Sequence, residues 1–387
     1  MSKSSLKRLV VAAIAFAVLA PSMAPAQAAG EIKIGVITST SGPLASYGTA
    51  YNEGLAWGLN YYTGGKMAIN GQKLVVTSKD DGADPASATA SFKEMVGNGT
   101  KVIVGTASSG VALTLAPLAA QNKVLYISGP AKNDLVTSAA NKYVFRSGNS
   151  STQDLAPLAG IKPISGKKVV LFVEDNAFGA GNIAAARALM TSKGALFEEI
   201  KVPTSTSDFT PFAKKAADAK GTYIFIAWSN ALTSGAMLTA LKVQGAFAKQ
   251  RPITGLAGVA SYNIYGTLFE GSNAILTSSY FAGAAKTGAA SDLATWYAAN
   301  KKTQDLFTST GADAAKMIVM ALTKNPSQNV DTMIKNLEGK SWVGVKGLMT
   351  IDPNTHLLIQ PMFLISLNKV GSGYSPTLLK TIAGVGK

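Results

Sequence analysis

Short apolar runs alternate with longer amphipathic stretches along most of this chain. The apolar runs are rich in β-branched residues and are bounded by Gly or polar residues, as in residues 32–37, 101–104 and 124–127. Such runs are typical of strands that are buried on both faces of a parallel sheet. The stretches between them place apolar residues at helical spacing. Repeated alternation of this kind predicts an α/β fold with parallel-rich sheets covered by helices on both faces.

The strand–helix pattern forms two successive series. The first series predicts strands at residues 32–37, 74–77, 101–104, 124–127 and 143–146, followed by a turn at 148–152. The second series predicts strands at residues 168–173, 196–202, 223–228, 253–256 and 274–281. Helices at 292–300, 311–322 and 329–337 and antiparallel strands at 347–351 and 360–367 complete the pattern. The change of series near Gly148 indicates two structural units.

A polar corner is predicted where two neighbouring strands of the first series end. Ser108 and Ser109 directly precede an apolar helical stripe, which is where a helix N-cap belongs. The next strand ends in Ser128, and Pro130 and Lys132 follow it. A helix N-terminus at the carboxyl end of a parallel strand offers N–H groups and a positive dipole to ligands. We therefore expect half of a binding site for a small anion here.

The first 28 residues have the pattern of a secretory signal peptide. Lys3, Lys7 and Arg8 are followed by an apolar run at residues 9–20 and by the small residues Ala26 and Ala28 around a cleavage site. The apolar run is too short to span a bilayer, and no later stretch is long and apolar enough to do so. Without any Cys the lipid-anchored variant of such a signal is excluded. We expect an exported, periplasmic protein that begins near Ala29.

Composition excludes several classes of function. Lys and Arg number 36 against 21 Asp and Glu, but the basic residues are scattered and do not alternate with aromatic residues. We therefore expect a solvated basic surface and no nucleic-acid partner. The absence of Cys and the single His356 argue against thiolate and histidine-based metal centres. We expect neither a metal nor a cofactor.

Two enzyme patterns fit the sequence poorly. Residues 106–110, TASSG, approach the G-x-S-x-G elbow of serine hydrolases, and acids and His356 follow downstream. However, Thr106 occupies the first glycine position, and His356 would lie in a terminal antiparallel turn. The dinucleotide fingerprint G-x-G-x-x-G does not follow the first strand. A secreted serine hydrolase is thus a remote alternative, and we expect no enzyme.

Six segments together carry a family resemblance. The segments are EIKIGVITSTSGPLASYG, KDDGADPASATASFKEMV, VIVGTASSG, VLYISGPAK, FVEDNAFGAG and GLMTIDPNTH. As a set they resemble the class I periplasmic solute-binding proteins of ABC importers, in the branched-chain amino acid (Leu/Ile/Val-type) group. The resemblance implies two Rossmann-like lobes joined by three crossovers, the type I periplasmic binding protein fold. Lobe 1 would comprise residues 29–148 plus 280–355, and lobe 2 residues 149–279 plus 356–387.

The resemblance also implies a mechanism and partners. A small ligand would be clamped between the lobes by hinge closure and delivered to permease subunits in the membrane, and we expect a monomer. A periplasmic ligand sensor with the same fold is the alternative, which would differ in its partner and not in its pocket.

Ligand positions can be carried over from the family one at a time. Tyr47 corresponds to an aromatic residue that covers the ligand, and Ser109 to the serine that holds the ligand carboxylate. Phe178 and Asn230 stand at the two tyrosine positions of the second lobe. The full set of expected ligand-binding residues is Tyr47, Ser108, Ser109, Ser128, Pro130, Lys132, Phe178, Trp228, Asn230 and Ala257.

Two residues depart from the family pattern. Ala257 stands where the family has an acid that pairs with the ligand ammonium, and Lys132 stands where a hydroxyl residue helps to hold the amino acid. Because a buried ammonium needs a partner, this exchange predicts a carboxylate ligand without an α-amino group, such as an organic or aromatic acid. Glu174 or Asp175 could instead receive an ammonium, so an amino acid remains open.

Overall fold

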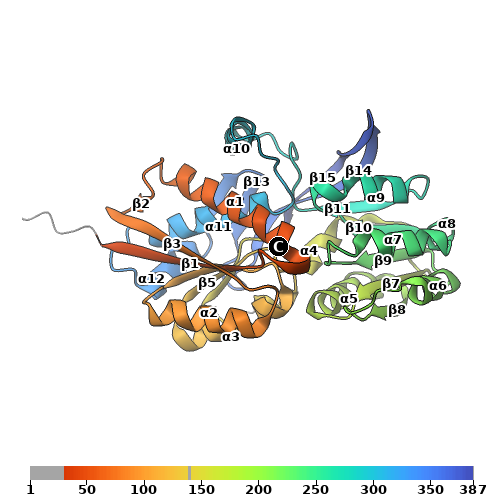
Figure 1. Cartoon of the computed structure of the whole chain (residues 1–387), viewed down its shortest axis with the longest axis horizontal. Coiled ribbons are helices and arrows are strands. Elements are labelled where there is room, and N and C mark those ends of the chain that lie inside the picture. The colour runs from red at the N-terminus through yellow and green to blue at the C-terminus, as the bar shows by residue number, and fades with distance from the viewer. Residues whose placement is uncertain (1–29, 138–140, 387) are drawn as a thin grey trace, which may run out of the picture.

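The computed structural model describes residues 30–137 and 141–386, and shows two lobes, each built around its own sheet (Figure 1). The predicted signal peptide lies outside these residues. No helix within the described ranges combines the length and the apolar character that crossing a membrane requires.

The sheet of lobe 1 is mostly parallel, with the strand order β2-β3-β1-β4-β5-β6. Its strands are β1 (Glu31–Thr38), β2 (Ala68–Ile69), β3 (Gln72–Asp80), β4 (Val102–Gly105), β5 (Leu125–Ser128) and β6 (Val144–Arg146). One core packs α1 (Ala45–Tyr62), α11 (Thr308–Leu322) and α12 (Val330–Leu337) against this sheet. A second core on the other face contains α2 (Pro85–Gly97) and α3 (Ser109–Asn122). Helix α10 (Gly288–Ala299) packs on the outer side of α1 through Leu293 and Trp57.

Lobe 2 is built on a second sheet whose central strands run in the order β8-β7-β9-β10-β11-β14. Its parallel strands are β7 (Lys168–Glu174), β8 (Leu196–Val202), β9 (Tyr223–Ala227), β10 (Arg251–Gly255) and β11 (Ile275–Ser278). Helices α4 (Ser151–Leu155) and α5 (Ala177–Met190) contribute to one core. The opposite core takes α6 (Thr210–Asp218), α7 (Ser234–Val243), α8 (Ala246–Lys249) and α9 (Tyr262–Phe269).

Strand β14 (Leu358–Val370) links the two lobes near the end of the chain. Its first residues pair with β13 (Gly347–Ile351), which in turn pairs with β12 (Ser341–Gly344). Further along, β14 pairs with β11 and with β15 (Gly373–Val385). Leu358 packs in a lobe 1 core, whereas Phe363 packs in a lobe 2 core. The chain therefore passes between the lobes within the first residues of β14. The residue boundaries predicted for the two lobes stay predictions.

Among the elements that depart from the sequence interpretation are α4, α9 and β15. The turn predicted at residues 148–152 contains the start of α4, whose N-cap Ser150 and Gln153 form a capping box. Helix α9 and strand β15 were not predicted. Strand β15 is mostly exposed and contains Pro376, so it lacks the apolar alternation that marks a half-buried strand.

Candidate functional site

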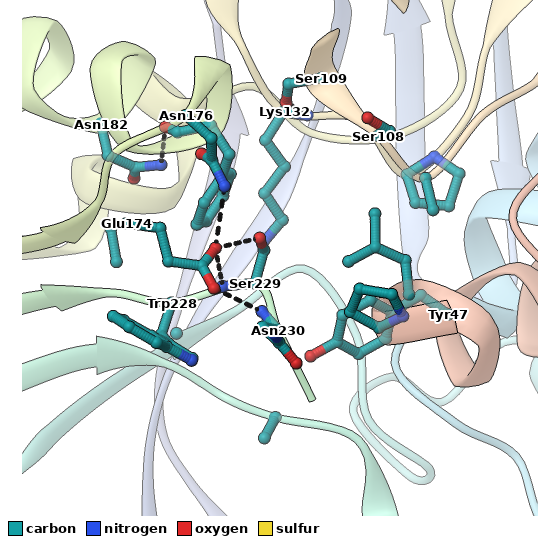
Figure 2. A pocket seen from close by; sticks show the side chains of 18 of the residues that line it. Tyr47, Ser108, Ser109, Lys132, Glu174, Asn176, Asn182, Trp228, Ser229 and Asn230 are labelled. Atoms are coloured by element: carbon teal, nitrogen blue, oxygen red, sulfur yellow. Dashed lines mark hydrogen bonds between the residues drawn. The ribbon is translucent and has the colours of Figure 1, made fainter. Parts of the chain in front are cut away.

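A cavity of about 550 Å³ lies between the two lobes (Figure 2). Its size is in the range of pockets that enclose small molecules. Lobe 1 contributes the start of α1, the start of α3 and the segment after β5, and lobe 2 contributes the ends of β7, β9 and β10. These are the carboxyl ends of parallel strands and the helix starts that follow them, which is where open α/β sheets bind ligands.

Most of the expected ligand residues lie around this cavity. The lining includes Tyr47, Ser108, Ser109, Pro130, Lys132, Phe178, Trp228, Asn230 and Ala257. Ser128 is the exception, because it is fully buried at the end of β5 and does not line the cavity. Its carbonyl oxygen accepts hydrogen bonds from the backbone N–H and the hydroxyl of Ser147 at 2.9 and 3.1 Å. After β5 the chain first reaches the cavity at Pro130. Ser128 therefore belongs to the sheet and not to the site.

The start of α3 forms a corner that favours a hydrogen-bond acceptor. Ser108 is the N-cap, and its hydroxyl accepts from the N–H of Val111 at 3.4 Å. The hydroxyl oxygen of Ser109 accepts from the N–H groups of Lys132 and Asn133, both at 3.3 Å. A hydroxyl has two acceptor sites and one proton, so Ser109 retains only its O–H for a ligand. Together with the unpartnered first N–H groups and the dipole of the helix, this corner suits a carboxylate.

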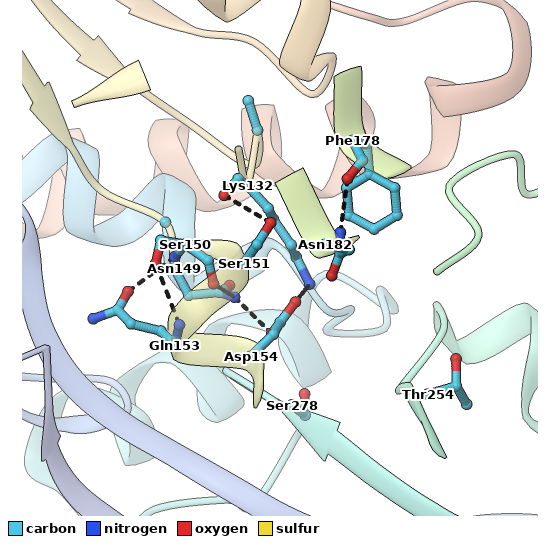
Figure 3. A network of polar contacts seen from close by, with 12 residues as sticks. Lys132, Asn149, Ser150, Ser151, Gln153, Asp154, Phe178, Asn182, Thr254 and Ser278 are labelled. Carbon is cyan, nitrogen blue, oxygen red and sulfur yellow. Dashed lines mark hydrogen bonds and ion pairs between the residues drawn. The ribbon is translucent and has the colours of Figure 1, made fainter. Parts of the chain in front are cut away.

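Lys132 is paired with a carboxylate of the protein itself (Figure 3). Its Nζ lies 2.6 Å from Oδ2 of Asp154 in α4, and the two side chains are only 12% and 9% exposed. The other oxygen of Asp154 accepts from Nδ2 of Asn149 at 2.6 Å. Burial raises the pKa of Asp154, although the charge of Lys132 opposes that rise. The charge of Lys132 is therefore balanced inside the protein, which removes it as a reason to expect a ligand without an ammonium group.

Glu174 places a second carboxylate at the cavity, from the lobe 2 side (Figure 2). It is 2% exposed. Its Oε2 accepts from Nδ2 of Asn176 and the N–H of Ser229, both at 3.0 Å, and also from the Ser229 hydroxyl. Its Oε1 accepts from the N–H of Asn230 at 3.0 Å. A carboxylate oxygen offers about two acceptor positions. Oε1 of Glu174 therefore keeps the capacity to accept a hydrogen bond from a ligand. The neighbouring Asp175 is exposed and does not line the cavity.

Aromatic side chains close the cavity from both lobes. Tyr47 meets Phe307 edge to face with the ring centroids 5.2 Å apart, and burial raises the pKa of the Tyr47 phenol. Trp228 packs edge to face on Phe209 at 5.4 Å, and its indole N–H donates to Thr233 Oγ1 at 3.1 Å. These contacts provide a largely apolar enclosure around the polar corner and Glu174.

Asn230 lines the cavity, but its backbone N–H and its side-chain oxygen both make hydrogen bonds within the protein. Its backbone N–H binds Glu174, and its side-chain oxygen accepts from the N–H groups of Leu232 and Thr233 at 3.0 and 3.3 Å. The side chain thus caps the start of the following segment. Its predicted role as a direct ligand contact stays a prediction.

Several lining residues were missed by sequence reasoning. They are Asp154, Asn182, Tyr265, Leu306 and Phe307. They come from α4, α5, α9 and the segment before α11, which approach the cavity only through tertiary packing. The capping pattern S-x-x-Q at Ser150 to Gln153 was the one local signal that could have revealed α4 and with it Asp154.

The serine-hydrolase alternative is not supported by the geometry. The ring of His356 stacks on Phe145, and its nitrogens lie 3.1 Å from the carbonyl oxygen of Val144 and 3.3 Å from Oε1 of Glu338. His356 does not line the cavity that contains Ser109. Within residues 30–137 and 141–386, no group of His, Asp or Glu side chains is arranged to hold a metal ion.

Comparison with known proteins gives matches over most of the chain. A family model described as periplasmic binding protein matches residues 31–372. The Leu/Ile/Val-binding protein homolog 6 of Brucella abortus (strain 2308) is 24% identical over 382 residues, covering 95% of each chain. The Leu/Ile/Val-binding protein homolog 3 of Brucella melitensis biotype 1 is 27% identical over 201 residues. That match spans only 54% of the relative, so the chain covers about half the length of the Brucella melitensis protein.

Solved structures share the architecture. An ABC-type branched-chain amino acid transporter from Rhodopseudomonas palustris CGA009 is 28% identical, with a TM-score of 0.76 over 92% of this chain and 97% of that one. A solute-binding protein of Rhodopseudomonas palustris HaA2 in complex with p-hydroxybenzoic acid has a TM-score of 0.80 with the same coverage of 92% and 97%. At 21% identity, this second likeness shows the fold alone. The chain belongs to the periplasmic binding protein family, whose members are solute-binding proteins of ABC transporters and not enzymes.

Proposed function

We propose that this protein is the solute-binding component of an ABC importer. It clamps one small carboxylate-bearing molecule between its lobes and delivers it to a membrane permease from the periplasm, where the predicted signal peptide directs it. The observation that carries the proposal is the α3 corner, where the Ser109 hydroxyl can only donate and the helix dipole favours an anion.

The charges around the cavity favour an amino acid as the ligand. Lys132, Asp154 and Glu174 contribute one positive and two negative charges. A simple acid would add a further negative charge to this buried site, whereas an amino acid brings an ammonium group that Glu174 can accept. Because uncompensated buried charge is costly, the zwitterion is the better-supported ligand. This reverses the preference drawn from Ala257 and Lys132 in the sequence.

An organic or aromatic acid is the second candidate. The aromatic residues Tyr47, Phe178, Trp228 and Phe307 around the cavity favour a flat apolar body. A hydroxyl on such an acid would give Oε1 of Glu174 a donor without adding a charge. The hydroxybenzoate complex of the HaA2 protein is an example of such a ligand on the same fold.

Ligand-dependent thermal unfolding of the mature protein tests the proposal. The panel contains L-leucine, its des-amino analogue 4-methylpentanoate and its carboxyl-blocked analogue leucinamide. It also contains L-phenylalanine, 3-phenylpropanoate, benzoate and p-hydroxybenzoate. A ligand at a hundred times its Kd stabilises the folded state by about 2.7 kcal/mol, which shifts the Tm measurably.

Each result of the panel has a defined meaning. Stabilisation by leucine or phenylalanine, but not by their des-amino analogues, identifies an amino-acid site. Stabilisation by the acids alone identifies the second candidate, and stabilisation by leucinamide as strong as by leucine contradicts the carboxylate role of the α3 corner. If no compound on the panel binds, the proposed ligand class is wrong. Loss of ligand uptake after deletion of the gene supports delivery to a permease, whereas unchanged uptake with a lost cellular response favours the sensor.

A further inference from the structure

Asn133 lies beside the α3 corner with all of its polar groups in use. It is 4% exposed and does not line the cavity. Its N–H donates to Ser109 Oγ at 3.3 Å, and its side-chain oxygen accepts from the N–H of Leu135 at 3.0 Å. Its carbonyl oxygen accepts from Arg146 Nη2 at 2.6 Å, and its Nδ2 donates to the carbonyl oxygen of Ala177 at 2.6 Å.

The last of these bonds connects the two lobes. Asn133 follows β5 of lobe 1, whereas Ala177 is the first residue of α5 in lobe 2. Asn176, which precedes it, binds Glu174, and Phe178, which follows it, lines the cavity. We call the hydrogen bond from Asn133 Nδ2 to Ala177 O the Asn133 latch. It joins the lobe 1 wall of the cavity directly to the helix that carries part of the lobe 2 wall.

A glycine in α5 leaves the space that the Asn133 latch needs. A Cβ atom at Gly181 would lie 2.9 Å from Asn133 Nδ2 and 3.1 Å from its Cγ, and the three nearest atoms to it all belong to Asn133. Contacts below 3 Å are not tolerated without movement. Since the Asn133 side chain is held at both of its polar atoms, it cannot move aside without losing a hydrogen bond. The surface of α5 is thus complementary to Asn133 at this one point.

The segment that carries Asn133 is held rigidly against the hinge. Arg146 is fully buried, and its Nη1 and Nη2 donate to the carbonyl oxygens of Ala131 and Asn133, both at 2.6 Å. The carbonyl of Lys132 between them accepts from the N–H of Ser151 at 2.7 Å. Arg146 Nη1 also donates to the carbonyl of Asn149 at 3.3 Å, where the chain leaves lobe 1. Ser109, the segment 131–133 and the first crossover therefore form one hydrogen-bonded unit.

We infer that Asn133 is a positioning residue that holds the lobes closed over a ligand seated at Ser109. The inference rests on the proposed clamping function and names the contact that maintains the closed state. Other hydrogen bonds also join the lobes, among them those from the N–H of Ala231 to Pro43 O at 3.2 Å and from the N–H of Val259 to Asp305 Oδ1 at 2.9 Å. Contacts between the lobes that share a residue with the donors to Ser109 include the ion pair of Lys132 with Asp154 in α4, and the Asn133 latch. Of these two, only the Asn133 latch reaches α5, so it couples occupation of the α3 corner to the position of that helix.

Two substitutions on opposite lobes test the Asn133 latch. Asn133→Asp keeps the size and the acceptor for Leu135, but it replaces the donor by an oxygen that faces Ala177 O. Gly181→Ala fills the space in α5, while alanine itself favours the helix. Each variant should weaken binding by about tenfold, the fold-change expected for one lost hydrogen bond. Surface plasmon resonance against immobilised protein, with L-leucine and p-hydroxybenzoate as probes, should place this loss in koff and leave kon within about twofold.

The double variant and a control sharpen this test. Asn133→Asp combined with Gly181→Ala should bind no more weakly than either single variant, because both remove the same contact. Gly288→Ala at the start of α10, where a Cβ would meet nothing within 4 Å, should bind as the wild type does. Unchanged Kd values in both single variants, or losses that add in the double variant, would overturn the inference.

A ligand-independent measurement keeps the inference separate from the proposed function. The chain has no Cys, so spin labels can be attached only at introduced cysteines. Thr49→Cys on α1 and Ala236→Cys on α7 place one label on an exposed position of each lobe. In pulsed EPR, Asn133→Asp and Gly181→Ala should both shift the interlobe distances to larger values. If the wild type binds no compound of the panel, the proposed ligand class fails and these distances alone decide the inference. Identical distance distributions in all variants would refute it.

Discussion

The two walls of the cavity achieve their polarity by different means. The lobe 1 wall presents donors, which come from the start of α3 and the Ser109 hydroxyl. The lobe 2 wall presents an acceptor, because four donors of the protein, from Asn176, Ser229 and Asn230, hold the Glu174 carboxylate in place. In lobe 1 the helix start is set by the local chain and Ser109 is held by the segment 132–133, whereas in lobe 2 Glu174 is held mainly by the loop after β9.

This difference teaches how a two-lobed binder can select the orientation of its ligand. A molecule with an acceptor at one end and a donor at the other satisfies both walls only when the lobes close, and only one way round. A ligand that lacks one of these ends leaves a buried polar group of the protein unsatisfied, which costs about 1–3 kcal/mol. Substitutions on either wall separate the contributions of the two.

The largest effect is expected for Glu174→Gln. The amide keeps one acceptor oxygen but turns an NH₂ group toward N–H donors, so we expect the free energy of unfolding to fall by about 3 kcal/mol. Urea unfolding followed by circular dichroism measures this loss. Asp175→Asn at the exposed neighbouring position is the control and should change stability by less than about 0.5 kcal/mol. Equal stabilities of the two variants would mean that Glu174 does not organise the lobe 2 wall.

The next effect concerns the ion pair on the lobe 1 side. Lys132→Met leaves Asp154 buried without its partner and should destabilise the protein by about 2 kcal/mol. Adding Asp154→Asn to the same chain should recover most of this loss. Lys142→Met, whose partner Asp331 is exposed, should cost less than about 0.5 kcal/mol in the same unfolding experiment. A double variant as unstable as Lys132→Met alone would contradict a charge-based explanation.

A smaller effect, on binding and not on stability, is expected for Ser109→Ala. The variant removes the O–H donor of the α3 corner, and calorimetric titration should show a loss of about 1.5 kcal/mol for a carboxylate ligand. Leucinamide offers the matched comparison, because it has no carboxylate for that donor. A loss for the amide as large as for the acid would show that Ser109 acts only through the neighbouring segment.

The smallest effect is a dependence of affinity on pH. Burial raises the pKa of Asp154, so this group takes up a proton at a higher pH than an ordinary Asp. Protonation releases Lys132 for the ligand carboxylate, and affinity should therefore rise as the pH is lowered from 8 to 5, by about threefold. Asp154→Asn should remove this dependence. Affinity that falls with decreasing pH in the wild type would contradict the assigned sign.

The α3 corner could be predicted from the sequence because its signal is local. An N-cap and the first turn are determined within a few residues, and Ser108, Ser109 and the apolar run after them lie next to one another. The alternating strands and helices likewise predicted the sheets of both lobes, because buried parallel strands have a distinctive composition. Phe178 and Asn230 came from the family resemblance, and both line the cavity.

The rest depends on contacts between distant parts of the chain. Lys132 looked like a free cation because nothing in its own segment shows that α4 brings Asp154 to 2.6 Å from it. Glu174 is one of two adjacent acids, and only the loop after β9 determines that it, and not Asp175, turns toward the cavity. Ser128 was misplaced because a strand end gives no sign of the residue at which the chain leaves the sheet. The positions of these side chains are determined by tertiary contacts, which local sequence patterns do not show.

The position of β14 has a consequence for how this protein comes to be folded. Strand β14 lies beside β11 in the lobe 2 sheet, although it is among the last elements to be synthesised, and α11 and α12 cover one face of the lobe 1 sheet. While translation is under way, both sheets therefore lack neighbours that belong in their cores. Contacts between such distant positions form slowly, and neither core can be completed until nearly all of the chain is made. The time at which either lobe can reach its native packing is therefore set by the synthesis of the last elements of the chain.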